Sequence, residues 1–544
     1  MFNLAISLAG TSIALIFTDR FPGWTFKGLF SCIFGINFSI QLFWDILIYP
    51  NFVTPLRYVP CVPGTVSQLH ILMDSPRGQL PLKWMRTIPN NGLIRFRDIF
   101  RHSHLIATNH QALLDIMSTN TYDFEKPWKA REFLARIIGF GLILSEGNAH
   151  RVQRKALTPA FNIKNIRSLY TLMWEKTNIL IDELEKEVKE NPMEGTNTNS
   201  SVGKVEMSVW ASRLTLDIIG PVAMGRDFQS LTHKENKVAD SFLRILEPTK
   251  EKLIFLAVNF IFPQWFASRL PWKLNRVVNE ETGYLRSVCH EIVQEKRRAL
   301  QSQKADTSEL DADILGTIML RGEFSDDELV DQMLTFLAAG HETTASALTW
   351  ACYLLCQYPD VQNRLRQEIH DTIPSSNSPI TWTQLEAMPL LNGVCQEVLR
   401  LYPTVPNTVR EAVRDTVVAG VSVPRGTMIT LSPYAINRSP HFWGDTGAEF
   451  IPERWIDTDE KGNKTVNHNG GAPTNFAQIT FLHGQRSCIG KDFARAELRC
   501  AVAGVVGRFM MEMQDPNQEI HIAGAVTTKP RDGMHLKMTA VDGW

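Results

Sequence analysis

A cysteine between two glycines constrains this chain more than any other feature of its sequence. The segment reads Phe481-Leu-His-Gly-Gln-Arg-Ser-Cys-Ile-Gly490, and an apolar pattern typical of a helix follows Cys488 at once. A thiolate at the start of a helix is stabilised by the helix dipole and by free backbone N–H groups, and Arg486 adds positive charge. The segment therefore predicts a cysteine with a lowered pKa that suits a metal ligand.

The spacing of this segment decides between two interpretations. A Gly-x-x-x-Cys pattern alone is satisfied by a buried cysteine in a glycine-rich turn. The fuller pattern, Phe-x-x-Gly-x-Arg-x-Cys-x-Gly, is much more restrictive. We therefore interpret Cys488 as a functional residue rather than a core cysteine.

A long helix is predicted in the middle of the chain. Ser325 followed three residues later by Glu328 forms a capping box, and the apolar pattern then continues to Gln357, where Pro359 ends it. At about 1.5 Å per residue such a helix is on the order of 50 Å long and crosses a whole domain.

The centre of this helix is unusually polar, because it reads Ala339-Gly-His-Glu-Thr-Thr344. One interpretation is a kinked helix with a close packing contact at Gly340, since a mid-helix threonine can bond back to the carbonyl four residues earlier. The other is a notch where a hydroxyl, from Thr343, and a carboxylate, from Glu342, relay protons to a small ligand. The segment alone leaves both interpretations open.

Four motifs in order give the chain its family resemblance. The cysteine segment resembles the haem-binding motif of the cytochrome P-450 family, and residues 339–344 resemble the oxygen-activating helix of that family. Glu397-x-x-Arg400 and Phe450-x-Pro-Glu-Arg-Trp455 resemble two further motifs. The resemblance covers roughly residues 65–540. It implies a mainly α fold, a helix-rich domain with small β-sheets, and a buried network in which Arg454 joins Glu397 and Arg400.

The resemblance also implies a cofactor and its protein partners. Cys488 would be the axial ligand of the iron in haem b, and the two haem carboxylates need basic partners. The family's third helix commonly has Trp-x-x-x-Arg, where this chain has His150 and Arg154; the histidine departs from the commonest form but still donates a hydrogen bond. Arg410 and Arg486 are similar to two other positions that hold these carboxylates.

The activity implied by the resemblance is that of a monooxygenase. One oxygen atom from O2 enters a substrate C–H bond, with Glu342 and Thr343 steering protons. The chain has no convincing Gly-rich nucleotide loop followed by a second domain, so we expect NADPH-derived electrons from a separate membrane-bound reductase. A docking patch for that reductase is expected from charge and position at four residues: Arg151, Lys155, Lys491 and Arg495.

Two uncharged runs near the N-terminus predict a membrane anchor. Residues 1–18 and 28–44 are each near the lower limit of about 17–25 residues for a spanning helix. Either one run spans alone or the two form a hairpin. We expect an anchor over residues 1–50, a proline-rich connector over 51–64 and a haem-binding catalytic domain over 65–544. The expected location is the endoplasmic reticulum membrane, with the domain facing the cytosol.

Composition excludes some partners and leaves the substrate open. Lys and Arg number 56 against 57 Asp and Glu, a balance that gives no reason to expect a nucleic acid. The eight cysteines show no Cys-x-x-Cys pair, which argues against zinc and for a reducing compartment. Phe336 and Val405 are expected in the wall of a pocket for a lipophilic small molecule.

The resemblance is nearest to microsomal forms and, within them, to fungal forms of specialised metabolism. A terpenoid, polyketide or alkaloid substrate is expected, and a fatty acid stays open. The alternatives are a haem-thiolate isomerase or dehydratase that uses no external O2, a haem-binding sensor or carrier, and a membrane protein without haem. The Glu342-Thr343 pair argues against the isomerase, which needs no proton relay.

Overall fold

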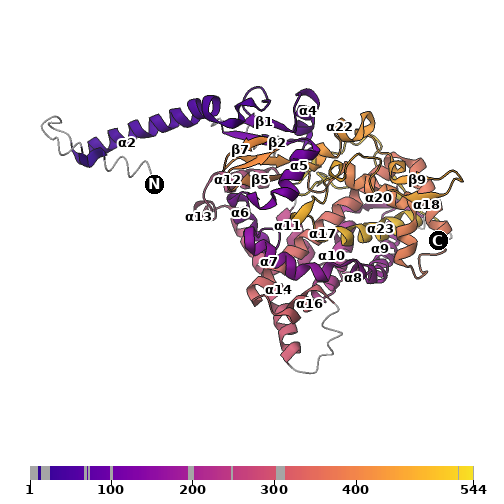
Figure 1. Cartoon of the computed structure of the whole chain (residues 1–544). Helices are drawn as coiled ribbons and strands as arrows, with labels where there is room; N and C mark the ends of the chain where they lie inside the picture. Colours follow the sequence, from indigo (N-terminus) through magenta and orange to yellow (C-terminus); the bar gives the residue numbers. More distant parts are fainter. Residues whose placement is uncertain are drawn as a thin grey trace.

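The computed structural model describes residues 10–13, 25–66, 70–71, 74–98, 102–193, 201–233, 235–246, 249–301, 313–524, 526–542 and 544. The chain is mainly helical with small sheets, as the sequence predicts, and one helix, α2, projects from the body (Figure 1). The expected apolar run at residues 1–18 lies outside the described residues except at 10–13.

The helices follow in chain order. The first half of the chain contains α2 (Phe26–Phe43), α4 (Gln79–Thr87), α5 (His110–Leu114), α6 (Trp128–Ile138), α7 (Gly147–Leu157), α8 (Ile163–Ser168), α9 (Tyr170–Glu190), α10 (Met207–Met224), α11 (Lys237–Leu246), α12 (Lys250–Ile261) and α13 (Gln264–Ala267). The second half contains α14 (Lys273–Gln301), α16 (Ile314–Arg321), α17 (Asp326–Gln357), α18 (Pro359–Thr372), α19 (Trp382–Ala387), α20 (Pro389–Leu401), α21 (Pro433–Ile436), α22 (Pro440–Trp443) and α23 (Lys491–Arg508).

The largest described sheet has the order β1-β2-β8-β5-β3. Its strands are β1 (Leu93–Arg97), β2 (Ser103–Ala107), β8 (Met428–Leu431), β5 (Thr408–Ala412) and β3 (Phe124–Glu125). A second sheet joins β11 (Phe509–Met513), β14 (His535–Ala540) and β4 (Val202–Glu206). Three described two-stranded pairs are β6 (Thr416–Val418) with β7 (Val421–Val423), β9 (Ile456–Thr458) with β10 (Lys464–Val466), and β12 (Ile522–Ala523) with β13 (Lys529–Pro530).

The Val- and Thr-rich segment after residue 415 forms the hairpin of β6 and β7. Val418 pairs with Val421, and the two residues between them, Ala419 and Gly420, have φ of 48° and 77°. Two successive left-handed residues form the kind of tight turn that matches the twist of the paired strands.

The predicted long helix is confirmed as α17, which runs through the centre of the domain (Figure 1). Ser325 accepts a hydrogen bond from the Glu328 N–H, and the Glu328 carboxylate accepts one from the Ser325 N–H, so the capping box is complete. The close contact expected at Gly340 is also present, because a Cβ atom there would lie 2.8 Å from Cδ1 of Ile219 on α10. A larger residue at 340 would have to displace the Ile219 side chain.

The largest core cluster surrounds α17. It includes buried side chains from α9, α10, α17 and α23, such as Met173, Leu214, Leu348 and Leu498. A second cluster packs the main sheet against the β6–β7 hairpin and includes Leu105, Val418 and Ile429. The candidate site residues lie on α7, at the middle of α17 and in the loop before α23.

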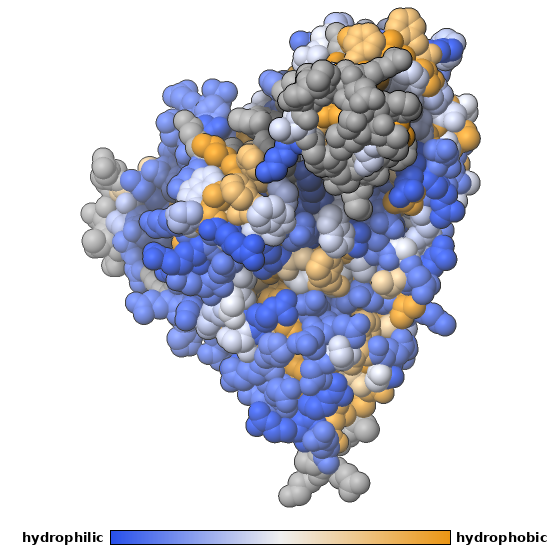
Figure 2. Space-filling model, turned by 90° about the vertical axis from the view of Figure 1, so that its left-hand side faces the viewer, coloured by the Kyte–Doolittle hydropathy of each residue, from blue (hydrophilic) through white to orange (hydrophobic). Residues whose placement is uncertain are grey.

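The N-terminal helix has the length and composition of a membrane span. The mostly apolar stretch Lys27–Val53 is long enough to cross a membrane and is largely exposed; in it α2 is continued by a π-helical segment, Trp44–Val53. The helix therefore extends three residues beyond the expected anchor boundary at residue 50. Apolar residues also gather on the face of the domain from which this helix projects (Figure 2).

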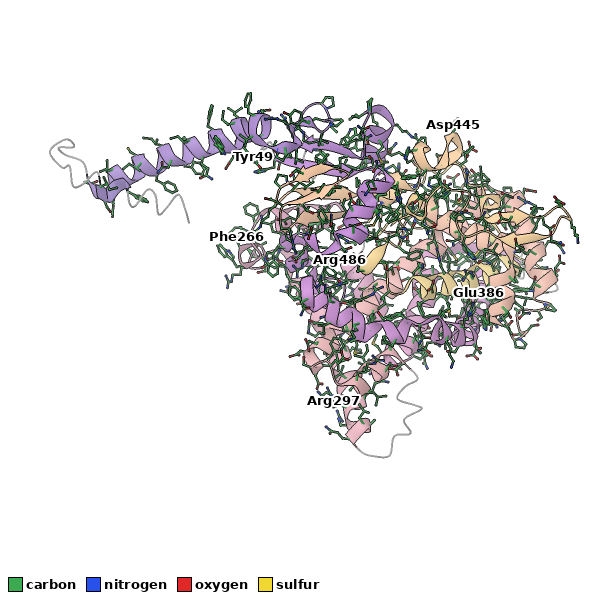
Figure 3. The ribbon with its side chains drawn as sticks, viewed as in Figure 1. Tyr49, Phe266, Arg297, Glu386, Asp445 and Arg486 are labelled. Atoms are coloured by element: carbon green, nitrogen blue, oxygen red, sulfur yellow. The ribbon has the colours of Figure 1, made fainter. Side chains whose placement is uncertain are left out.

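The proline-rich segment after this helix is attached to the main sheet. Arg95 of β1 donates its N–H to Pro60 O at 2.7 Å and accepts from the Val62 N–H at 2.8 Å. Arg97, two residues along β1, donates to the Asn51 side chain at 3.1 Å and to Pro50 O at 3.5 Å. The last turn of the projecting helix, where Tyr49 lies (Figure 3), is thus bonded to the domain.

Candidate active site

The cysteine segment forms a tight loop before α23. The Cys488 N–H donates to Phe481 O at 2.8 Å, and a 3-10 turn covers Gly484–Arg486. Gly484 has φ of +68°, and a Cβ atom there would collide with the Met117 carbonyl oxygen. This glycine is therefore required both for the turn and for the packing of the loop against the segment Asp115–Thr119.

The prediction of a lowered Cys488 pKa is wrong for the protein alone. Burial raises the pKa of the thiol, although the Gly490 N–H and the charges of Arg154 and Lys491 oppose the rise. The sequence argument counted the helix start and the cations but not the loss of water around the sulfur. Cys488 nevertheless keeps accessible surface and is not sealed in the core.

Helix α7 brings His150 and Arg154 to this loop. Arg154 Nη1 donates to the Ser487 carbonyl oxygen at 2.7 Å, next to Cys488. His150 is buried, and its Nδ1 shares a hydrogen bond of 3.2 Å with the Tyr122 hydroxyl. Burial, together with Arg486 and other nearby cations, lowers the pKa of His150 to about 3, so this ring is neutral.

Arg410 and Arg486 are both deeply buried near Glu146. Arg410 lies on β5 and donates to Thr408 Oγ1 and Val409 O, each at 2.9 Å. Burial lowers its pKa to about 10. Arg486 lies inside the domain (Figure 3), forms an ion pair with Glu146, and leaves its Nε without a hydrogen-bond partner among the described protein atoms.

Sequence reasoning missed two members of this cluster. Lys126 contacts the Glu146 carboxylate at 3.5 Å, and its backbone N–H donates to the same oxygen at 3.0 Å. Burial and the charge of Arg410 lower the pKa of Lys126 to about 7. Neither residue belongs to a recognisable motif, and only the meeting of the β3–α6 loop with the start of α7 brings them together.

The cluster holds more positive charge than its one carboxylate balances. The cationic side chains are Lys126, Arg154, Arg410 and Arg486, with His150 neutral among them. Buried charges are costly unless they are paired, so such an arrangement fits an anionic ligand. The two carboxylates of haem have the matching charge, and the adjacent Cys488 thiol is the matching iron ligand.

On α17 the structure places Glu342 and Thr343 at half-buried positions. Thr343 Oγ1 donates to Ala339 O at 2.7 Å, the back-bond expected of a mid-helix threonine. The Glu342 carboxylate lies 3.3 Å from Lys529 Nζ of β13, a partner that the sequence did not reveal. Both interpretations of this segment are therefore compatible: the helix has a close contact at Gly340, and it also carries a hydroxyl beside an ionised pair.

The Glu397–Arg400 pair at the centre of this network is fully buried. Arg400 Nη2 and Nε donate to the two Glu397 oxygens at 2.6 and 2.8 Å, and neither side chain is exposed. Arg454 Nε lies 3.4 Å from Glu397, and Trp455 Nε1 donates to it at 2.9 Å. Arg400 also donates to the carbonyls of Asn437 and Gly447, which fixes the segments that precede the cysteine loop.

The remaining predicted positions differ in exposure. Phe336 is buried with its ring 5.7 Å from that of Phe161, and Val405 is half-buried. In the expected docking patch Arg151 and Lys155 are exposed, whereas Lys491 and Arg495 are half-buried. Arg495 also lies over the Phe481 ring at 5.5 Å, which limits its reach into solvent.

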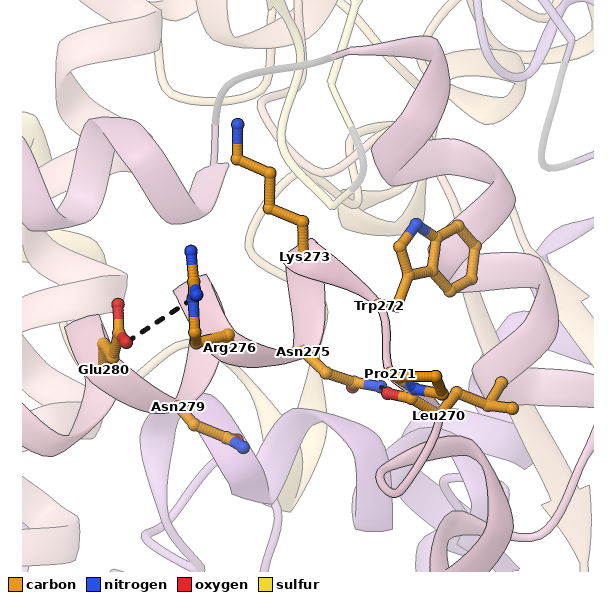
Figure 4. Close-up of a pocket in the computed structure, with 8 residues that line it drawn as sticks. All are labelled: Leu270, Pro271, Trp272, Lys273, Asn275, Arg276, Asn279 and Glu280. Carbon is orange, nitrogen blue, oxygen red and sulfur yellow. Dashed lines mark hydrogen bonds and ion pairs between the residues drawn. The ribbon is translucent and has the colours of Figure 1, made fainter.

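A surface hollow of about 760 Å³ lies elsewhere, at the start of α14. Figure 4 shows its lining, with Arg276 and Glu280 paired at 3.7 Å across one turn. None of the cluster residues lines this hollow. Its position separates it from the Cys488 loop, and we assign it no part in the site.

Comparisons with known proteins agree with this geometry. The cytochrome P450 family model matches residues 97–536. The chain is 38% identical over 524 residues to cytochrome P450 monooxygenase sphH of Aspergillus fumigatus, covering 94% of this chain and 93% of the relative. It is 34% identical over 564 residues to cytochrome P450 monooxygenase ALT8 of Alternaria alternata, covering 94% of each.

A solved structure shares the fold. The crystal structure of the haem domain of cytochrome P450DA superposes with a TM-score of 0.70 at 23% identity, covering 89% of this chain and 97% of that chain. The family match spans most of the chain, and the fold, the cysteine loop and the buried cationic cluster agree with it. The chain therefore belongs to the cytochrome P450 family of haem-dependent monooxygenases.

Proposed function

We propose that Cys488 supplies the thiolate ligand of the haem iron and that the enzyme inserts one atom of O2 into a lipophilic small molecule. Electrons come from a separate NADPH-dependent reductase. The observation that carries the assignment of the site is the buried cationic cluster beside the Cys488 loop, whose charge Glu146 alone does not balance.

The cluster would hold the two haem carboxylates through charge-assisted hydrogen bonds. Arg154, Arg410 and Arg486 are the main donors, and Arg486 Nε has no other partner among the described residues. Because its pKa is lowered to about 3, the His150 ring is neutral, and its one N–H group donates a hydrogen bond. Lys126 joins them, and an anion at this place would restore its positive charge.

Bound at this site, haem with a thiolate ligand supplies the chemistry of O2 activation, because the thiolate pushes electron density that favours O–O cleavage. The chain's own residues manage the proton. The half-buried Glu342 exchanges protons with solvent, and Thr343 carries a hydroxyl that gives up its bond to Ala339 O when it donates elsewhere. Orientation of the substrate and exclusion of water complete the protein's share.

The proposed organisation has an N-terminal anchor that ends with the helix at Val53 instead of at the expected residue 50, a connector up to residue 64 and the catalytic domain over 65–544. The domain faces the cytosol from the endoplasmic reticulum membrane. The apolar helix Lys27–Val53 and the reducing environment suggested by free cysteines support this arrangement. The substrate belongs to fungal specialised metabolism, a proposal supported by fungal monooxygenases of similar length and sequence.

The test is the carbon monoxide difference spectrum of the reduced, purified chain. Wild type is expected to show the strongly red-shifted Soret band of a thiolate-ligated haem. Cys488→Ala should lose that band, whereas Cys32→Ala, which changes an exposed cysteine on α2, should keep it. A band that survives in Cys488→Ala would contradict the ligand assignment, and a wild-type protein without haem would contradict the function.

A further inference from the structure

The surface hollow at the start of α14 has walls that are fixed by contacts within the protein. The Trp272 ring packs edge-on against that of Phe255 on α12, with 5.5 Å between the ring centroids. Asn275 donates from its side-chain amide to Ala267 O at 2.8 Å and to Leu270 O at 3.0 Å. Packing and hydrogen bonds therefore set the shape of this hollow of about 760 Å³.

A cation without a carboxylate partner lies behind one of these walls. Arg136 of α6 donates to the side-chain oxygens of Asn275 and Asn279 at 3.2 and 3.1 Å. It also donates to the side-chain oxygen of Asn259 at 3.3 Å. The three amides satisfy the guanidinium but carry no charge to balance it. Since Asn275 and Asn279 both line the hollow, the positive charge of Arg136 lies directly behind its lining.

Two further cations line the hollow itself. Lys273 is exposed, and Arg276 forms an ion pair of 3.7 Å with Glu280 in which both side chains are largely exposed, so the pair is weak. Figure 4 shows Lys273 and Arg276 extending to the same side of the helix start. Glu280 is the one carboxylate among the lining residues, and the first turn of α14 adds the positive end of a helix dipole. The hollow therefore favours an anion.

The neighbouring helix α13 adds an apolar surface. Trp265 and Phe266 of this helix are 65% and 41% exposed. Helix α13 lies on the side of the domain from which α2 projects (Figure 1), and Phe266 is labelled there in Figure 3. A positively charged hollow beside exposed aromatic side chains matches the two parts of an anionic amphiphile, its head group and its acyl chains.

We propose that this hollow binds the phosphate head group of an anionic membrane phospholipid, whose acyl chains lie along the exposed side chains of α13. Arg276 exchanges its weak pair with Glu280 for two parallel hydrogen bonds to the phosphate, and Lys273 contributes a point charge. Arg136 bonds the side-chain oxygen of Asn279, which leaves the NH2 group of that amide to donate to the phosphate.

The three cations also predict which phospholipids bind. A head group with a net negative charge, such as phosphatidylserine, is attracted, whereas the choline cation of phosphatidylcholine is repelled. The site is separate from the Cys488 loop and needs no oxygen chemistry. It rests on the proposed membrane location only for the source of the lipid.

Native mass spectrometry of the haem-loaded full chain in detergent tests the site. The probe is dioctanoyl-phosphatidylserine, titrated beside dioctanoyl-phosphatidylcholine, and wild type is expected to bind the serine lipid more tightly. Lys273→Gln should weaken that binding about fivefold, the usual contribution of one basic residue near an anionic lipid. Arg298→Gln, which removes an exposed cation at the other end of α14, should not. Equal binding by wild type and Lys273→Gln would overturn the proposal.

Asn279→Asp tests the geometry with almost no change in side-chain size. The new carboxylate would pair with Arg136 and repel a phosphate, so lipid binding should be lost while the carbon monoxide spectrum stays that of wild type. Unchanged lipid binding in this variant would contradict the site.

Inorganic phosphate distinguishes the two sources of a phosphate group. It is expected to bind much more weakly than the lipid, and binding of equal strength would overturn the lipid as the occupant. A wild-type chain without the thiolate Soret band would refute the proposed function and leave the lipid result unaffected.

Discussion

Lys529 Nζ lies 3.3 Å from Glu342 Oε1, so the C-terminal β12–β13 hairpin contacts the polar segment of α17 directly. The same hairpin is fixed on both sides of this pair. The Thr528 N–H donates to Thr404 O at 2.8 Å, and Thr528 O accepts from Ser346 Oγ of α17. The position of Glu342 therefore depends on a segment that is 187 residues away in sequence.

Lys529→Met should release the Glu342 side chain. Because both partners keep about a fifth or less of their side chains exposed, we expect the free energy of unfolding to fall by about 1 kcal/mol, near the upper end for partly exposed pairs. Urea unfolding measures this. Lys537→Met, which breaks a more exposed pair with Glu512, should cost less, and equal losses in the two variants would contradict the prediction.

Thr343→Ala should uncouple electron use from product formation, because the hydroxyl that moves the proton is lost. We expect product per NADPH consumed to fall on the order of tenfold or more, since general acid–base catalysis typically contributes about 10²–10⁴-fold to the rate of the step it serves. Thr349→Val is the matched control, since Thr349 makes the same back-bond of 2.8 Å to Ala345 O further along α17. Equal coupling in wild type and Thr343→Ala would exclude the relay role.

Glu397→Gln should destabilise the domain strongly. Removing one charge of a fully buried pair leaves Arg400 uncompensated, which typically costs about 3–5 kcal/mol. The expected result is a large loss of folded, haem-containing protein, measured by the carbon monoxide spectrum per unit of protein. Lys186→Met, which breaks an exposed pair with Glu183, should leave the yield unchanged.

Charge reversal of Arg151 and Lys155 should slow turnover driven by the reductase about tenfold at low salt and spare turnover driven by peroxide. Both side chains are exposed on α7, close to the Cys488 loop, and charge complementarity acts mainly on the rate of association. The difference should shrink as salt is raised. Equal losses in the two assays would mean that the variant damages the site itself.

The stability of the chain should depend on pH through Glu497. Burial raises the folded pKa of Glu497 to about 8, above the ordinary carboxyl value of 4.5. The folded state therefore binds more protons than the unfolded state between these values. The stabilising contribution is complete below pH 4.5 and is lost as pH rises towards 8, by up to about 1.4 kcal/mol per pH unit. Subtracting the pH profile of Glu497→Gln isolates this slope, and parallel profiles would contradict a neutral Glu497.

Local patterns were sufficient to predict the elements that carry the site. The Ser325 capping box defined the start of α17, and the Glu397-x-x-Arg400 spacing indicated a pair on one helix face. Each of these features is decided by residues within a few positions of one another, where helix and turn geometry leave little choice.

Contacts between distant segments could not be predicted in this way. Lys126 with Glu146 and Lys529 with Glu342 join loops and hairpins that no spacing relates. The prediction of a lowered Cys488 pKa was wrong for a related reason. The desolvation of the thiol depends on all the segments that pack around the loop. Glu497 is buried, and neither of its carboxyl oxygens has a hydrogen-bond partner among the described protein atoms. The sequence could not reveal this, because it shows a charged residue but not the groups that surround it.

The bonds between β1 and the end of the projecting helix have a mechanical consequence. Arg95 is bonded to Pro60 and Val62, and Arg97 is bonded to Pro50 and Asn51. The end of the helix is therefore attached rigidly to the sheet and is not connected to it by a flexible linker. A bilayer around this helix would therefore fix the orientation of β1, and with it the orientation of the whole domain relative to the membrane. Loss of the Arg97 hydrogen bonds to Asn51 and Pro50 would let the domain adopt several orientations relative to the lipid without any change in the active site.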